Sequence, residues 1–462
     1  REAPQPPAPL TFSVSPLTLL AQVHDMTAGS RSDSIAAIAT PAGPGGIGVV
    51  RVSGPLALTL AQTFLGRRPK PRFAHRCRFR DADGELIDDG LLLAFPGPKS
   101  FTGEDVIELQ AHGSPVLLGA LLRRCVELGA RLARPGEFSE RAFLNDKLDL
   151  AQAEAVADLI AAGSESAARA AMRSLDGEFS RRVDALARQL VELRVYVEAA
   201  IDFPEEEIDF LRTDEVRARF AAIDLILHEL LAGARRGQRL RDGLNVVILG
   251  APNVGKSSLL NALAGHDRAI VTAIPGTTRD LLREHLNVDG LPLTIVDTAG
   301  LRATADEVES EGIARATREA RRADLVLWVV DGREAGTANR ESQEPPSDSR
   351  FPVPGTRITL YNKLDLTGGE PRLERHDDGV HVYLSAKTGD GLDLLRRALL
   401  EHAGLADGGG GDFSARARHV DALVRCQQQL ASAREHALQT GDGDLAAEDL
   451  RLAHEHLGEI TG

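Results

Sequence analysis

The sequence predicts a multidomain protein that combines α/β domains with a helical domain. Short β-like runs alternate with helical runs as far as about Ala133, an apolar pattern with helical spacing follows, and a glycine-rich loop then opens a second α/β segment. Helix-forming composition returns towards the C-terminus. We therefore expect an N-terminal α/β domain over 33–148, a helical domain in two parts over 149–243 and 405–462, and an α/β domain over 244–404 inserted between those parts.

Length and composition narrow the class of protein. The chain has 462 residues, of which 43% are hydrophobic, enough for two or three domains with sizeable cores. Its net charge of −14 argues against general attraction to nucleic acid, so any RNA contact would need a local basic patch or the help of a partner. Cys77, Cys125 and Cys426 are far apart and lack metal-ligand spacing, which fits reduced cytoplasmic thiols. No apolar run reaches membrane-spanning length.

The first 32 residues differ from the rest of the chain. The segment Arg1–Pro9 is rich in Pro and Ala, and the first Met is Met26. A signal peptide fits poorly, because Pro16 interrupts the apolar stretch and the basic end contains a single Arg. We expect Met26 to be the natural start, residues 1–25 to be upstream sequence without a folded role, and the leader 1–32 to be disordered or non-native.

The first α/β domain is expected from short runs rich in β-branched residues. The predicted strands are Ile35–Ala39, Gly48–Val52 and Leu91–Phe95, and the predicted helix is Val116–Leu128. The glycines from Gly43 to Gly48 match the GxGxxG pattern of dinucleotide-binding sites. However, they lead into β-branched residues instead of a helix, and the acidic residue expected about twenty positions later is absent. We therefore reject a dinucleotide site there.

The helical domain is predicted from an apolar stripe with three- and four-residue steps. This stripe, expected to lie on one long helix and to form the packing seam of a bundle, consists of Leu175, Phe179, Val183, Leu186, Leu190, Leu193 and Val197. The run Gly408–Gly411 is expected to be a flexible hinge, and Phe413–Leu457 returns to helix-forming composition.

A phosphate-binding loop opens the inserted domain. Gly250–Ser257 reads GAPNVGKS, a complete GxxxxGK[ST] pattern, and the strand-like run Asn245–Leu249 leads into it. Backbone N–H groups of such a loop, and of the helix that follows, bind phosphate oxygens. Lys256 can reach the β- and γ-phosphates, and the Ser257 hydroxyl can bind Mg²⁺.

Three further segments indicate GTP. The sequences DTAG at Asp297–Gly300, NKLD at Asn362–Asp365 and SAK at Ser385–Lys387 follow in the order and approximate spacing of a regulatory GTPase, so we expect a Ras-like P-loop domain. Asp297 ends an apolar strand, where a carboxylate can hold the water shell of Mg²⁺. Asp365 can accept hydrogen bonds from the guanine N1–H and exocyclic amine, which adenine does not offer.

The residue after Asp-x-x-Gly departs from the Ras pattern. Ras-like enzymes place a water-orienting Gln there, whereas this chain has Leu301, which cannot hydrogen bond through its side chain. The acidic residues that follow are candidates to replace it, and no spacing argument chooses among Asp306, Glu307, Glu309 and Glu311. In the phosphate loop, the amide oxygen of Asn253 could hold a monovalent cation where other GTPases receive an arginine finger.

The chain resembles the MnmE (TrmE) family of bacterial tRNA-modification GTPases over residues 33–462. The stretches that carry the resemblance, four of them outside the GTPase domain, are Asp33–Pro41, Ser100–Asp105, Arg134–Lys147, Glu198–Pro204 and Val271–Asp280. The resemblance implies a folate-binding N-terminal α/β domain, through which two copies form a homodimer. It also implies cytoplasmic GTP hydrolysis that needs Mg²⁺ and is stimulated by K⁺.

The resemblance also implies site residues. The family's GTP contacts fall on Asn253, Val254, Gly255, Lys256, Ser257, Ser258, Thr272, Thr277, Thr278, Asp297, Thr298, Ala299, Gly300, Asn362, Lys363, Asp365, Ser385, Ala386 and Lys387. Its metal ligands fall on Ser257 and Thr278 for Mg²⁺, and on Asn253, Thr272, Ile274 and Thr277 for K⁺. The water-orienting residue falls on Glu309, and the contacts to 5-formyl- or methylene-tetrahydrofolate fall on Arg51, Glu108 and Lys147.

The implied reaction adds a (carboxymethyl)aminomethyl group at C5 of the wobble uridine of tRNA, in a heterotetramer with the FAD-dependent MnmG (GidA) protein. Family members continue past Glu459–Gly462 to a terminal Phe-Cys-Ile-Gly-Lys, so we expect a C-terminally truncated product that lacks a candidate catalytic thiol. Two alternatives stay open: a ribosome-assembly GTPase, which should carry an RNA-binding appendage, and a regulatory switch without one-carbon chemistry. Folate binding would discriminate against both.

Overall fold

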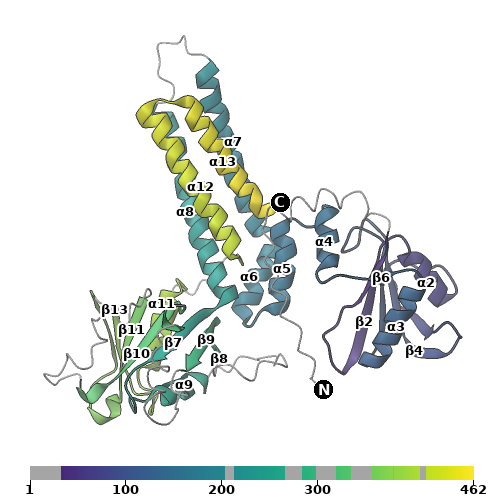
Figure 1. Cartoon of the computed structure of the whole chain (residues 1–462), viewed down its shortest axis with the longest axis horizontal. Helices are drawn as coiled ribbons and strands as arrows, with labels where there is room; N and C mark the ends of the chain where they lie inside the picture. Colours follow the sequence, from purple (N-terminus) through teal and green to yellow (C-terminus); the bar gives the residue numbers. More distant parts are fainter. Residues whose placement is uncertain are drawn as a thin grey trace, which may run out of the picture. The chain divides into compact units, whose positions relative to one another are not determined.

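The computed structural model describes residues 33–202, 213–265, 283–297, 319–334, 356–377, 379–405 and 413–462. They belong to two compact units, one ending at Leu148 and the other beginning at Asp149 (Figure 1). The leader 1–32 and the expected hinge Gly408–Gly411 lie outside the described residues. No helix within the described ranges is long and apolar enough to span a membrane.

The first unit contains a six-stranded sheet. Its strands are β1 (Ile35–Ile38), β2 (Gly45–Ser53), β3 (His75–Arg80), β4 (Leu86–Phe95), β5 (Val106–Gly113) and β6 (Arg131–Leu132). Its helices are α2 (Ala57–Leu65), α3 (Pro115–Glu127) and α4 (Glu137–Leu144). The strand order is β3-β4-β5-β2-β1-β6, and all neighbours are antiparallel except β1 and β6.

One face of this sheet forms the core of the first unit. Inward-facing residues such as Phe79, Leu92 and Leu109 join a buried cluster with residues of α2 and α3, among them Leu121. The glycines from Gly43 lead into strand β2 and not into a helix, as expected. Gly48 is required for packing, since a Cβ there would lie 2.3 Å from the Leu118 Cδ1 of α3. The opposite face of the sheet carries charged residues such as Arg51 and Glu108 together with exposed apolar residues such as Leu91.

The second unit begins with helices. They are α5 (Leu150–Ala161), α6 (Glu165–Leu175), α7 (Glu178–Asp202) and α8 (Asp214–Asp242), and two more follow the α/β segment, α12 (Ala417–Glu435) and α13 (Gly443–Thr461). A π-helical turn, His436–Thr440, separates the last two. Figure 1 shows α7, α8, α12 and α13 running side by side. One buried cluster contains Leu190, Phe220, Phe413 and Leu450, so helices from both sides of the α/β segment share a core.

The predicted long helix is wrong at its first position. Leu175 is the last residue of α6, and α7 begins only at Glu178. The break occurs at Gly177, whose φ of 81° lies in the left-handed region. The other stripe residues, from Phe179 to Val197, are at most 1% exposed and do form the packing seam of α7.

The α/β part of the second unit contains a seven-stranded sheet. Its strands are β7 (Leu244–Leu249), β8 (Arg283–Val288), β9 (Leu291–Asp297), β10 (Leu325–Asp331), β11 (Thr356–Asn362), β12 (Arg372–His376) and β13 (Gly379–Tyr383), in the order β12-β13-β11-β10-β7-β9-β8. Its helices are α9 (Lys256–Ala264) and α11 (Leu392–His402), with 3₁₀ turns at Gly332–Glu334 and Leu364–Leu366. The central strands are parallel and the two edge strands antiparallel. The loops after β7, β10, β11 and β13 therefore lie along one edge, where doubly wound sheets bind ligands.

Candidate functional site

The phosphate loop has a backbone that side chains would disrupt. Gly250 has φ 149°, and a Cβ there would lie 2.2 Å from the Val329 carbonyl oxygen of β10. Gly255 has φ 99°, and its Cβ would lie 2.3 Å from the Asn362 Nδ2. Both contacts are far closer than van der Waals packing permits, so the two glycines of the GxxxxGK pattern are required by the fold.

The first turn of α9 provides the anion-binding end of the loop. Lys256, the first helical residue, donates hydrogen bonds from Nζ to the carbonyl oxygens of Gly250 and Ala251, each at 2.8 Å. Ser257 and Ser258 are exposed, whereas Val254 and Leu259 are buried against the sheet. The N–H groups of a first helical turn have no partners within the helix, so they can bind phosphate oxygens.

Asn362 connects three of the predicted motifs. It is 2% exposed, and its Nδ2 donates to the Val254 carbonyl oxygen at 2.8 Å. Its Oδ1 accepts from the backbone N–H of Ala386 at 2.9 Å. The amide thereby fixes the NKLD and SAK segments against the phosphate loop, and both its hydrogen-bonding ends are used within the protein.

The carboxylate of the NKLD segment is oriented by a buried hydroxyl. Ser385 is fully buried, and its Oγ donates to the Asp365 Oδ1 at 2.7 Å. Asp365 itself is exposed, as is Lys387 two residues beyond Ser385. A carboxylate held in this way can accept two N–H donors from one edge of a base.

Asp331 is a site residue that the sequence did not single out. It ends β10 opposite Asn362, is 5% exposed, and accepts a 2.8 Å bond from the Lys363 Nζ. The Arg333 guanidinium, which bonds the same carboxylate at 3.0 and 2.8 Å, and the Lys363 ammonium hold the pKa of Asp331 well below its usual range. Asp331 therefore orients Lys363. The signal was a carboxylate at the end of a buried parallel strand.

Other predicted residues of this site cannot be compared with the structure. Leu301, its neighbouring acidic residues and eight predicted site residues lie outside the described residues. These eight are Thr272, Ile274, Thr277, Thr278, Thr298, Ala299, Gly300 and Glu309. Asp297 ends β9, paired in register with Ile248 of β7, and only its backbone is described. Ser257 and Asn253 are thus the described members of the predicted Mg²⁺ and K⁺ sites. Asn253 has φ 63°, a left-handed conformation that asparagine tolerates.

The first unit has a pocket on the sheet face opposite its core. Its volume is about 340 Å³, and its lining includes Arg51, Glu108 and Phe101. Arg51 of β2 and Glu108 of β5 are register partners, and the Arg51 Nε and Nη2 donate to the Glu108 Oε1 at 3.0 and 2.7 Å. The Arg51 guanidinium carbon lies 5.7 Å from the centre of the Phe101 ring, within the range of cation–π contact. The pocket can accommodate a flat polar heterocycle.

Lys147 is not part of this pocket lining. It is exposed and follows α4, and its Cγ lies 3.2 Å from where a Cβ on Gly103 would stand. Gly103 belongs to the segment 96–105, whose other residues Lys99, Ser100 and Phe101 line the pocket. The structure therefore brings two of the three predicted folate residues together and places the third beside the segment that borders them.

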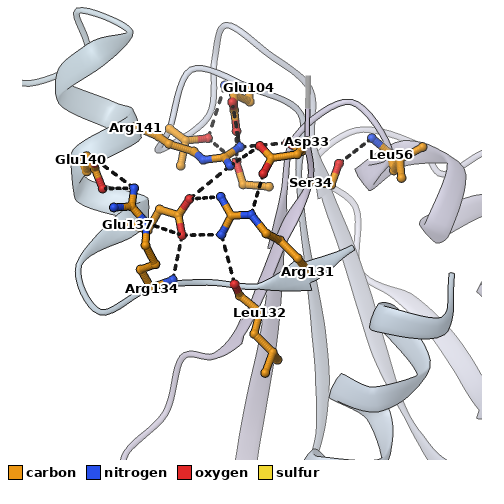
Figure 2. A network of polar contacts seen from close by, with 12 residues as sticks. Asp33, Ser34, Leu56, Glu104, Arg131, Leu132, Arg134, Glu137, Glu140 and Arg141 are labelled. Carbon is orange, nitrogen blue, oxygen red and sulfur yellow. Dashed lines mark hydrogen bonds and ion pairs between the residues drawn. The ribbon is translucent and has the colours of Figure 1, made fainter. Parts of the chain in front are cut away.

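An ion network anchors that segment (Figure 2). Arg141 of α4 donates to both oxygens of Glu104 at 3.1 Å and to the Asp33 carboxylate at 2.8 Å. Glu137, which is 2% exposed, bonds Arg131 at 2.8 Å and the Arg134 backbone N–H at 2.7 Å. Burial would raise the pKa of Glu137, but these hydrogen bonds lower it to about 2.

Comparisons with known proteins cover both units. A family model described as the MnmE helical domain matches residues 150–462, and one described as the GTP-binding protein TrmE N-terminus matches residues 34–147. The tRNA modification GTPase MnmE of Pseudomonas aeruginosa strain UCBPP-PA14 is 56% identical over 432 residues, covering 93% of this chain and 95% of that protein. The protein of that name from Marinobacter nauticus is 55% identical over 434 residues, with the same coverage.

Among solved structures, a crystal structure of Aquifex aeolicus Era bound to GDP·AlF4⁻ is 23% identical, with a TM-score of 0.27. It covers 40% of this chain and 66% of that one. That score is too low to carry an argument. The family models and the relatives are sufficient by themselves: the chain belongs to the MnmE family of tRNA modification GTPases.

Proposed function

We propose that this GTPase, together with a flavoprotein partner, adds a (carboxymethyl)aminomethyl group at C5 of the wobble uridine of tRNA, using a one-carbon unit carried by tetrahydrofolate. The observation that carries the proposal is the family match across both units, which includes the first unit with its Arg51 pocket as well as the GTPase part. A regulatory GTPase without one-carbon chemistry would need only the second unit.

In the nucleotide site, this chain's own residues bind and orient GTP. The loop N–H groups and Lys256 bind the phosphates, and Asp365, held by Ser385, selects guanine. Ser257 and Thr278 would hold Mg²⁺, which neutralises phosphate charge. Asn253, Thr272, Ile274 and Thr277 would hold K⁺ in place of an arginine finger. The exposed hydroxyl of Ser257 and the side-chain amide of Asn253 offer oxygen atoms, which are the ligands that these hard cations prefer.

The proposed K⁺ site predicts a cation effect on hydrolysis. Arginine fingers are worth about 10³ to 10⁵ in rate, and a monovalent cation of suitable radius supplies the same kind of charge stabilisation. We expect hydrolysis to be much faster in KCl than in NaCl at matched ionic strength. Equal rates in the two salts would exclude the cation mechanism.

Glu309 is proposed to orient the attacking water, because Leu301 cannot. Glu309→Ala should slow hydrolysis by roughly 10² with little change in GTP affinity, and Glu307→Ala, a control of the same charge two residues away, should do much less. Single-turnover hydrolysis and nucleotide titration separate the two effects. Equal losses in both variants would reject the assignment to one residue.

The Arg51 pocket is proposed to bind 5-formyl- or methylene-tetrahydrofolate, which supplies the one-carbon unit when bound. Glu108 receives both Arg51 hydrogen bonds on Oε1, so its Oε2 can accept the N–H groups of a pterin edge. Phe101 offers a ring on which the heterocycle can stack. Lys147 would contribute a positive charge from beside the bordering segment.

We further propose that the chain forms a homodimer through its N-terminal domain, assembles with the FAD-dependent MnmG protein into a heterotetramer, and acts on tRNA in the cytoplasm. The domain bounds proposed for this assembly are 33–148, 149–243, 244–404 and 405–462.

The complete proposal can be tested by complementation. The chain would be expressed in a bacterium that lacks its own MnmE, and wobble nucleosides of total tRNA would be quantified by mass spectrometry. We expect the C5 modification to return with the chain extended by the family's terminal Phe-Cys-Ile-Gly-Lys, and not with the same extended chain that carries Glu108→Gln. Restored modification by a chain that binds no reduced folate would favour a regulatory GTPase without one-carbon chemistry.

A further inference from the structure

A run of exposed basic residues lies in the first unit. Between residues 67 and 80 the chain has seven Lys or Arg residues and no Asp or Glu, although the whole protein has a net charge of −14. All seven are exposed. We call them the β3 basic surface, and they are Arg67, Arg68, Lys70, Arg72, Arg76, Arg78 and Arg80.

The strand that carries part of this surface has no partner on its outer side in the described sheet. β3 is the edge strand, and its residues alternate between buried and exposed. Cys77 and Phe79 enter the core, so Arg76, Arg78 and Arg80 all project from the other face. Residues two apart on a strand are about 6.6 to 6.8 Å apart, so the three arginines are attached at regular intervals along β3.

Few of these charges are neutralised within the protein. Among the described residues, Arg76 forms an ion pair with Asp89 at 2.8 Å, and Asp89 also stands opposite Arg78 in the strand register, so one carboxylate faces two of the seven charges. Arg80 donates to a carbonyl oxygen, that of Gly84, and so keeps its charge available. The nearby Asp88 is already bonded to His112, on both its side chain and its backbone.

An aromatic ring lies within the same surface. Phe73 is 50% exposed, packs against His75 with ring centres 5.0 Å apart, and has the Lys70 Nζ 5.4 Å from its ring centre. Exposed rings among arginines and lysines are typical of surfaces on which nucleic-acid bases stack while phosphates are neutralised. Charges on an edge strand also discourage pairing between molecules, but that role does not account for Arg67, Arg68 and Lys70 outside the strand.

The strand residues of the β3 basic surface, Arg76, Arg78 and Arg80, lie on the same sheet face as the Arg51 pocket. In the strand register Arg76 stands opposite Leu91, and Leu91 opposite Gln110. Gln110 is two residues from Glu108 on β5, and Glu108 stands opposite Arg51. Directly opposed residues and residues two apart share a face, so these side chains all lie on the face away from the core.

We propose that the β3 basic surface binds the phosphate backbone of tRNA and directs the RNA across this face towards the Arg51 pocket. This inference rests on the proposed function, since it gives the tRNA substrate a docking surface. Arg72, which belongs to the β3 basic surface and also lines the pocket, connects the two. Such a surface is the local basic patch that an acidic chain needs in order to bind RNA.

The test uses the full chain and a tRNA transcript with an unmodified wobble uridine. The variant Arg76→Gln/Arg78→Gln/Arg80→Gln removes the row from β3. Its control, Arg181→Gln/Arg188→Gln/Arg217→Gln, removes the same charge from exposed positions of the helical bundle. Affinity for the transcript would be measured over a range of salt concentrations.

Each lost phosphate contact should reduce the slope of log affinity against log salt by about 0.7 to 0.9, so the β3 variant should lose about 2 to 3 in slope and the control close to none. Phe73→Leu should weaken binding roughly fivefold or more without changing the slope, because stacking is lost and charge is not. GTP hydrolysis should be unchanged in all variants, and hydrogen exchange of α3 peptides should be unchanged in the β3 and Phe73 variants, which verifies that the first unit remains folded.

An unchanged slope in the β3 variant, or an equal loss in the control, would overturn the inference. So would normal tRNA binding combined with lost binding of the flavoprotein partner, which would assign the surface to an acidic protein. If the chain extended by the family's terminal segment modifies tRNA while the β3 variant binds tRNA normally, this inference alone fails. If that extended chain restores no modification, the proposed function fails.

Discussion

The nucleotide site and the Arg51 pocket are built in different ways. In the nucleotide site the backbone makes the binding surface, and the glycines at Gly250 and Gly255 are needed because neighbouring strands leave no room for a Cβ. In the Arg51 pocket the side chains make it: Arg51 and Glu108, 57 residues apart, meet because β2 and β5 pair in one register. A site made by the backbone tolerates few substitutions. In a site made by side chains, single substitutions can reduce the affinity by small amounts.

The comparison predicts that Gly255→Ala has the largest effect. Its φ of 99° strains any other residue, and the added Cβ would displace Asn362, which holds both nucleotide loops. We expect GTP affinity to fall by about 10² or more, equivalent to about 3 kcal/mol. Isothermal titration with GDP measures this loss of nucleotide affinity. Gly458→Ala in α13 is the control, because a Cβ there meets nothing within 4 Å. Tight binding by Gly255→Ala would refute the backbone argument.

Asp365→Asn should have the next largest effect, and one of specificity. A neutral amide loses the charged acceptor for the guanine N1–H and amine, so we expect GTP to bind about 10²-fold more weakly. The Asn N–H groups can instead donate to a carbonyl at the same position of xanthine, so binding of xanthosine triphosphate should improve. Competition between the two nucleotides tests this. Ser385→Ala, which only releases the carboxylate, should shift GTP binding less and leave the preference for guanine intact.

The stability of the first unit should depend more on ion pairs than nucleotide binding in the second unit does. Because the pKa of Glu137 is lowered from 4.5 to about 2, its contribution is fully present above about pH 5 and is lost as the pH falls towards 2. We expect Glu137→Gln to destabilise the first unit by about 2 kcal/mol at neutral pH, about 30-fold in the unfolding equilibrium, and the gap from wild type to narrow on acidification.

Hydrogen exchange read by mass spectrometry can follow each unit separately. Peptides from α3 report on the first unit, and peptides from α12 serve as an internal control in the second. Glu140→Gln is the matched variant, because the exposed pair of Glu140 with Arg134 should contribute at most about 1 kcal/mol. Equal destabilisation by the two variants, or a gap that is independent of pH, would show that the buried network is not the cause.

The same contrast explains what the sequence could predict. The phosphate loop and the NKLD and SAK segments are contiguous patterns at strand ends, so the strands β7, β10 and β11 and the site they form could be inferred from residue order and spacing. The apolar stripe predicted the seam of α7, but not the break at Gly177. A glycine between two helical patterns can be accommodated or can end a helix, and tertiary packing decides between them.

The Arg51 pocket could not be derived from local patterns. Arg51 and Glu108 are ordinary charged residues on alternating strands, and only the register of the sheet brings them together. The family resemblance predicted that Arg51, Glu108 and Lys147 contact folate. The structure brings the first two together and places Lys147 beside the bordering segment, and their contacts with folate stay a prediction. Asp331 was missed for a similar reason, since its role depends on Lys363, which follows the neighbouring strand β11.

The smallest expected effects therefore separate the proposed folate residues. Arg51→Lys keeps the charge but loses the two-pronged bond to Glu108 and the contact with Phe101, so we expect affinity for 5-formyltetrahydrofolate to fall about tenfold. Lys147→Met removes an exposed charge outside the pocket lining and should weaken binding threefold or less, an effect that salt suppresses. Fluorescence titration of the full chain at two salt concentrations measures both. If Lys147→Met costs as much as Arg51→Lys, the ligand must extend past the bordering segment, and the folate site is larger than the pocket around Arg51.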